Sequence, residues 1–167
     1  ASDGASGSQF GVSIAMTTGT AGDLVLVGAP QHKHDSQGGS QHGAAYVFVR
    51  SGTSWSEMKQ IEPDDRSSDD NFGRGVDIIG DYAIVGAPNN DDNGTNSGSA
   101  YIFTWNGGNS WSGGGASMKF TASDAANSDY FGTSVSITYD QSVDKHYAIV
   151  GAYEANHGGK TDAGKAY

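Results

Sequence analysis

The stretch that decides the fold is Phe72–Phe103, "FGRGVDIIGDYAIVGAPNNDDNGTNSGSAYIF", because a closely similar sequence occurs once before it and once after it. Residues 10–48 read "FGVSIAMTTGTAGDLVLVGAPQHKHDSQGGSQHGAAYVF", and residues 131–167 read "FGTSVSITYDQSVDKHYAIVGAYEANHGGKTDAGKAY". The phenylalanines that open the three copies lie 62 and 59 residues apart. A period of this length, with several strands in each copy, predicts a solenoid or a propeller.

Short apolar blocks between clusters of Gly, Asn, Asp and Ser predict four strands per copy. In the second copy these blocks are "FGRGVDII", "YAIVGAP", "SAYIFTW" and, past a loop that holds Trp111, "SMKFTA". The first copy supplies four matching blocks, with Trp55 in the place of Trp111. Four sequential strands with short connections predict an antiparallel meander.

Side-chain alternation shows which faces of a strand are buried. In "YAIVGA", Tyr82 and Ile84 point to one side of the sheet, and Ala83 and Val85 point to the other. Both sides are apolar, so a neighbouring sheet must cover each of them. A radial stack of four-stranded sheets is a β-propeller. Small residues beside each FG predict that this strand is the innermost one, where backbones approach closely.

We therefore predict an all-β fold, a β-propeller segment of about three four-stranded antiparallel blades, the third incomplete. The expected repeats span about 1–63, 64–122 and 123–167. The third copy stops at Tyr167, inside the strand that continues to "VF" or "IF" in the other copies. Unpaired strand edges and uncovered apolar faces invite further pairing. We expect either further repeats of the same chain, which we prefer, or several copies that complete a ring together.

These residues resemble the FG-GAP repeat family, known from the N-terminal propeller of integrin α chains and from many secreted or surface proteins. The third copy departs from the pattern, since Tyr153 stands where proline is expected. The resemblance implies a propeller at an extracellular or cell-surface location. The motif residues, for which we expect structural roles, are Phe10, Gly11, Gly28, Ala29, Pro30, Phe72, Gly73, Gly86, Ala87, Pro88, Phe131, Gly132, Gly151 and Ala152.

The resemblance also implies calcium in an acidic D-x-D-x-D-G loop between the FG and GAP strands, but that loop is missing here. The second copy has only Gly80-Asp81 at this place, a tight hairpin turn. Calcium takes six to eight oxygen ligands, which a single aspartate cannot supply. The sequence names no certain cofactor, and calcium is a candidate without its usual loop.

The long polar loops after GAP hold the candidate site residues. Asp91, Asp92 and Asn93 offer oxygen ligands to calcium, although a solvated turn has the same composition. His32, His34 and His42 offer nitrogen ligands to zinc or copper, although an exposed, unpaired histidine cluster is the simpler reading. Asn93-Gly94-Thr95 also satisfies the rule for N-glycosylation.

Acidic segments lead into each FG, and their recurrence predicts a structural role in the crossover between blades. Their aspartates are Asp3, Asp64, Asp65, Asp69, Asp70, Asp124 and Asp129. Trp55 and Trp111 are candidates for sugar stacking, but their equal placement in two copies favours packing between blades.

Composition excludes several function classes. With 19 acidic against 9 basic side chains, the formal charge of -10 disfavours nucleic acid as a partner. No apolar stretch is long enough for membrane insertion, and no catalytic motif is present. We expect a noncatalytic extracellular scaffold or adhesion module that binds protein partners or other subunits through its loops and edges. The alternatives are a lectin-like propeller that binds glycans and an accessory propeller of a larger secreted enzyme.

Overall fold

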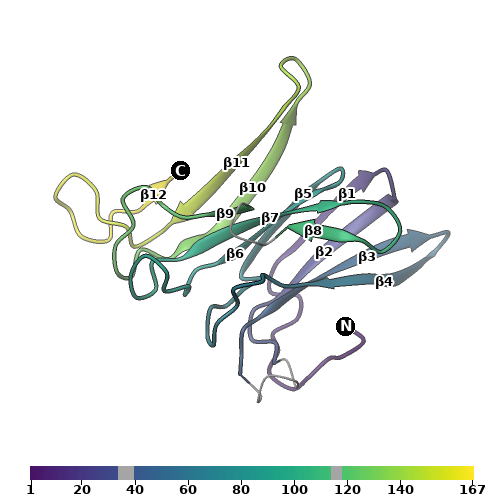
Figure 1. Ribbon diagram of the computed structural model, residues 1–167, viewed down its shortest axis with the longest axis horizontal. Helices are drawn as coiled ribbons and strands as arrows, with labels where there is room; N and C mark the ends of the chain where they lie inside the picture. Colours follow the sequence, from purple (N-terminus) through teal and green to yellow (C-terminus); the bar gives the residue numbers. More distant parts are fainter. Residues whose placement is uncertain (34–39, 114–117) are drawn as a thin grey trace.

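Three antiparallel sheets make up the chain (Figure 1). The computed structural model describes residues 1–33, 40–113 and 118–167. The first sheet has the order β1 (Ile14–Gly19), β2 (Gly22–Ala29), β3 (Ala44–Ser51), β4 (Ser54–Ile61). The second has the order β5 (Gly75–Ile79), β6 (Tyr82–Ala87), β7 (Ser99–Trp105), β8 (Trp111–Gly113), and β9 (Lys119–Phe120) also pairs with β7. The third has the order β10 (Phe131–Asp140), β11 (Lys145–Ala152), β12 (Lys165–Ala166).

The predicted all-β fold of successive meanders is confirmed. Each sheet follows chain order, and every strand pair within it is antiparallel. The sheets stand side by side in the manner of propeller blades, and the hairpin of β10 and β11 projects beyond the other strands (Figure 1). In the described part of the chain, no helix is long and apolar enough to cross a bilayer.

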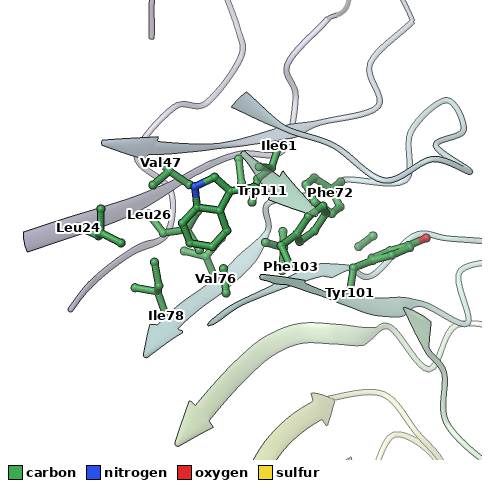
Figure 2. Packing of buried hydrophobic residues seen from close by; sticks show 14 residues of the cluster. Leu24, Leu26, Val47, Ile61, Phe72, Val76, Ile78, Tyr101, Phe103 and Trp111 are labelled. Atoms are coloured by element: carbon green, nitrogen blue, oxygen red, sulfur yellow. The ribbon is translucent and has the colours of Figure 1, made fainter. Parts of the chain in front are cut away.

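The prediction that the strand "YAIVGA" of the second copy buries both faces is also confirmed. On β6, Ala83 and Val85 belong to a cluster with Leu24 of the first sheet (Figure 2). Ile84, which points the other way, belongs to a second cluster with Ile137 and Val150 of the third sheet. The second sheet is therefore sandwiched between its neighbours, and this burial supplies most of the stabilising hydrophobic free energy.

The FG and GAP motifs lie where the backbones of neighbouring strands and sheets contact each other. Within a copy, the amide of Gly73 donates to the carbonyl of Gly86 over 3.0 Å. Between copies, a Cβ on Gly86 would lie 1.9 Å from the carbonyl oxygen of Gly132. Gly73 and Gly132 also have φ angles of 93° and 97°, which favour glycine. As predicted, the FG segments are innermost, and those of the second and third copies contact the GAP segment of the preceding copy.

The fourth strand differs from its prediction in both copies. In the first copy it begins at Ser54, so Trp55 lies in β4 and not in a loop. In the second copy the edge of β7 pairs with two short strands, β8 and β9, and Trp111 opens β8. The sequence reading placed both tryptophans in loops because glycine and serine surround them, but their side chains pack better on a strand than in a solvated turn.

Candidate functional site

The loops after GAP and the crossovers into FG lie at one end of the sheets, which we call the loop face. Parallel bridges join Gly43 to Phe72 and Gly98 to Phe131 at this end. The long loops of the first two copies therefore end beside the start of the next copy. Its described residues are 30–33, 40–43, 62–71, 88–98, 121–130 and 153–164.

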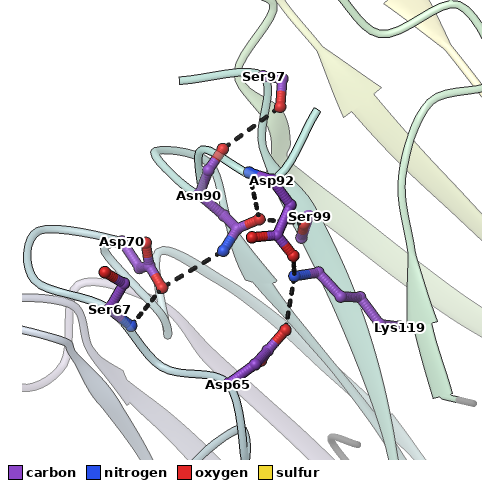
Figure 3. A network of polar contacts seen from close by, with 8 residues as sticks. All are labelled: Asp65, Ser67, Asp70, Asn90, Asp92, Ser97, Ser99 and Lys119. Carbon is purple, nitrogen blue, oxygen red and sulfur yellow. Dashed lines mark hydrogen bonds and ion pairs between the residues drawn. The ribbon is translucent and has the colours of Figure 1, made fainter. Parts of the chain in front are cut away.

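A buried polar network holds the loop face together between the first two sheets (Figure 3). The carboxylate of Asp70 accepts a hydrogen bond from the Ser67 amide over 2.8 Å and from the Asn90 side chain over 3.4 Å. Asn90 in turn accepts from the Ser99 hydroxyl over 2.8 Å. Asp70, Asn90 and Ser99 are all buried. Because these buried groups satisfy one another, they fix the crossover and the loop in one arrangement.

Lys119 joins the same region from β9 (Figure 3). Its ammonium group lies 2.6 Å from Asp65 and also pairs with Asp92, and it lies 5.2 Å from the centre of the Tyr101 ring. Burial lowers the pKa of Lys119, but the hydrogen bonds to Asp65 and Asp92 outweigh burial and raise the pKa above its usual value. The lysine is therefore a permanent cation that bridges crossover, loop and sheet.

Replacing Asp70 with asparagine is expected to change how stability depends on pH. Burial raises the pKa of Asp70 to about 6, from 3.8 in the unfolded chain, against the hydrogen bonds of Ser67 and Asn90. The folded state therefore binds the proton more tightly, and this group's stabilisation is complete below about pH 4 and lost as pH rises through 6. Urea unfolding between pH 4 and 7 measures the effect.

The asparagine in Asp70→Asn keeps the acceptor oxygen but does not titrate. At pH 7 the variant is expected to be more stable than the wild type, by no more than about 3 kcal/mol. The difference should disappear towards pH 4, where Asp70 is protonated. If the difference in the free energy of unfolding between variant and wild type stays the same from pH 4 to 7, the raised pKa of Asp70 is contradicted.

A second recurring acid, seven residues before each FG, meets the tyrosine of the same copy. The Tyr46 hydroxyl donates to Asp3 over 2.8 Å, and the Tyr167 hydroxyl donates to Asp124. In the second copy Lys119 lies between Asp65 and Tyr101. The predicted structural role of the lead-in acids agrees with these contacts. The fixed spacing in the sequence was the signal that could have found the tyrosine partners.

The calcium candidates already have protein partners. Asp91 accepts a hydrogen bond from the Asn96 amide over 2.7 Å, and Asp92 pairs with Lys119. Among the described residues, no three or more His, Asp or Glu side chains gather in a way that could hold a metal ion. Asn93 is exposed on the loop, and its glycosylation stays a prediction.

The histidines differ from the exposed cluster that the sequence suggested. His32 is only 3% exposed, and its ring contacts the Tyr46 hydroxyl at 3.1 Å and Asp3 at 3.3 Å. His42 is also buried, and His34 lies outside the described residues. The exposed reading of His32 and His42 was wrong, because the loop folds back so that His32 serves as a core hydrogen-bonding partner.

The two tryptophans occupy equivalent positions in the first and second copies, but their surroundings differ. Trp111 is buried between the first two sheets (Figure 2). Its indole N–H points to the sulfur of Met58 at 3.4 Å. Trp55 is 44% exposed, on the side of the first sheet away from the second. Trp111 is therefore a packing residue, and its ring is not available for sugar stacking.

Sequence reasoning missed an aromatic pair on the loop face. Tyr153, which replaces the proline of GAP, is 55% exposed and stacks on Tyr130 with ring centres 5.3 Å apart. Partial burial and a hydrogen bond with Glu154 raise the pKa of Tyr153, whereas the charge of exposed Arg74 acts in the opposite direction. The departure of Tyr153 from the motif was the available signal.

The sheets and their loop face define a propeller-type repeat module. The family model of the FG-GAP repeat matches residues 1–48, 55–103 and 115–167, and the chain therefore belongs to the FG-GAP repeat family. Comparison with curated proteins gives no match.

Proposed function

We propose that the chain is a noncatalytic extracellular or cell-surface scaffold that binds protein partners through its loop face. FG-GAP repeats form propeller-type modules that often serve in binding. The observation that carries the proposal is the exposed Tyr153, which stacks on Tyr130 and whose pKa partial burial raises and the charge of Arg74 lowers. Tyrosine and arginine are enriched among the few residues that dominate the affinity of protein interfaces. In the proposed mode of binding, side chains of the protein contact the partner directly, without a metal ion or cofactor.

The scaffold beneath these residues favours binding because it is preorganised. The amide of Thr95 donates to the side chain of Asn127 over 3.0 Å, and the amide of Ser128 donates to the carbonyl of Thr95 over 2.8 Å. Together with the network around Asp70, these bonds tie the loop of the second copy to the crossovers before and after it. A loop that is already ordered loses less entropy when a partner binds.

The charge of the loop face indicates the chemistry of the partner. Its exposed aspartates include Asp64, Asp69, Asp91, Asp124 and Asp162. Acidic groups around an aromatic centre favour a partner with a basic rim, and they raise its rate of association at low salt. Such a partner would bind more weakly as the salt concentration rises.

The test removes the aromatic centre with residues that other copies already carry. Tyr153→Pro introduces the residue found at Pro30 and Pro88, and Arg74→Thr introduces the residue found at Thr133. An array of purified extracellular and surface proteins is probed with the immobilised chain, and each hit is retested as a purified pair by biolayer interferometry. The double variant is expected to lose affinity about thirtyfold, the effect of a lost hot spot of about 2 kcal/mol.

Val143→Ser is the matched control, since Val143 is 52% exposed in the hairpin at the opposite end of the sheets. It should leave affinity unchanged. If the partners bind the double variant as tightly as they bind the wild type, the proposed binding face is wrong. A glycan array probed in parallel tests the lectin alternative, and glycan binding that depends on Tyr153 would replace the protein-binding proposal.

A further inference from the structure

The sequence contains two Asn-Gly dipeptides, Asn93-Gly94 and Asn106-Gly107. In such a dipeptide the backbone nitrogen of glycine can attack the side-chain carbonyl carbon of asparagine, because glycine has no side chain that obstructs the approach. Both asparagines are exposed, and both glycines are half-buried. The dipeptides are therefore a matched pair, and the structure around each of them decides which one reacts.

The Asn93-Gly94 dipeptide lies in a crowded turn. The Gly94 amide donates to the Asp91 carbonyl over 3.2 Å, and the Gly94 carbonyl accepts from the Ser97 amide over 2.9 Å. A Cβ on Gly94 would lie 2.6 Å from the side-chain oxygen of Asn127. The attacking nitrogen is thus engaged in a hydrogen bond, and little room remains beside it for a new ring.

The Asn106-Gly107 dipeptide lies in the open loop between β7 and β8. Within the described part of the chain, the Gly107 amide has no hydrogen-bond partner. A Cβ on Gly107 or on Gly108 would meet no atom within 4 Å. The side-chain nitrogen of Asn106 donates to the Ser112 hydroxyl over 2.6 Å. That bond engages only the amide nitrogen, so the carbonyl carbon of Asn106 stays open to attack by a free nucleophile.

We propose that Asn106 is a site of spontaneous deamidation in the folded chain, with water as the only co-reactant. The Gly107 nitrogen forms a bond to Cγ of Asn106, the bond from Cγ to Nδ2 breaks, and ammonia leaves with the proton that Gly107 has lost. The product is a five-membered succinimide. Water then adds to one of its two carbonyl carbons and opens the ring, which leaves either aspartate or isoaspartate.

The reaction changes the outer edge of the second sheet. Isoaspartate lengthens the main chain at Asn106 by one methylene group. The Asn106 amide donates to the Ser110 carbonyl over 2.8 Å, and the Trp105 indole donates to the Gly108 carbonyl over 2.9 Å. These bonds close the loop directly before Trp111, which packs between the first two sheets. The longer chain loosens this closure. The site lies outside the loop face, so its test is independent of the proposed binding function.

Peptide mass spectrometry of the folded chain, incubated in mildly alkaline buffer, tests the proposal. Conversion of the amide to a carboxylate raises the peptide mass, and electron-transfer dissociation distinguishes isoaspartate from aspartate. Asn106 is expected to convert about tenfold faster than Asn93, because the hydrogen bond of Gly94 must break before Asn93 reacts. In a chain unfolded in guanidinium, the two rates should become equal.

Two variants test the role of the loop. Asn106→Gln keeps the amide on a longer side chain and should show no conversion at this position. Ser112→Ala frees the Asn106 side chain and should raise its rate of conversion about threefold. If Asn93 converts as fast as Asn106 in the folded chain, or if folded Asn106 keeps its amide while the unfolded chain loses it, the proposal is wrong.

Discussion

Gly86→Ala is expected to lower the free energy of unfolding by more than about 3 kcal/mol, a loss reserved for severe packing or backbone defects. A Cβ at this position would lie 1.9 Å from the carbonyl oxygen of Gly132 and 2.7 Å from its carbonyl carbon. Both atoms belong to backbone, so the third sheet would have to move away from the second. Urea unfolding followed by tryptophan fluorescence measures the loss.

Gly151→Ala is the control, because Gly151 holds the same place in the motif without a following sheet against it. Its new methyl group would meet the Ser134 hydroxyl at 2.3 Å, a side-chain atom that can rotate away. The cost is expected to stay below about 1.5 kcal/mol, as for moderate changes of side-chain volume. Equal losses would show that the FG and GAP contact does not set the requirement for glycine.

The sequence predicted the fold because each sheet repeats the same pattern of apolar residues and glycines. Alternation in "YAIVGA" placed Val85 and Ile84 on opposite buried faces, and they do lie in different clusters. Close backbone approach at FG followed from small residues at fixed places, and Gly73 and Gly132 show it, since a Cβ on either would lie within 2.4 Å of a carbonyl oxygen. Local alternation and glycine spacing express packing directly, so they can be read without coordinates.

The candidate site was less accessible to sequence reasoning because its contacts join distant segments. Lys119 sits in an ordinary strand pattern, and nothing near it in sequence indicates that Asp65 and Asp92 approach it. His32 appeared exposed because polar residues surround it, yet Tyr46 and Asp3 bury it. Pairing of buried polar groups depends on tertiary geometry, whereas apolar alternation depends only on the strand.

Phe72→Ala is expected to destabilise the chain by about 3–5 kcal/mol, the usual cost of truncating a buried phenylalanine. Phe72 is fully buried, and its ring meets Tyr101 and Phe103 edge to face with centres 5.7 and 5.9 Å apart. Truncation leaves a cavity between the first two sheets, because backbone contacts at Gly73 prevent the sheets from closing over it. Urea unfolding of the purified variant measures the cost.

Phe10→Ala is the matched control, since Phe10 meets Tyr46 and Phe48 in the same geometry, with ring centres 5.5 and 6.0 Å apart. Phe10 is 44% exposed because no sheet of the same chain covers it. Its truncation buries no cavity and should cost about 1 kcal/mol, near the average for single substitutions. The difference between the two variants measures how much a covering sheet adds to the stabilisation by the FG phenylalanine. If both variants lose the same free energy of unfolding, contacts within one sheet dominate, and the neighbouring copy does not account for the stabilising effect of the FG phenylalanine.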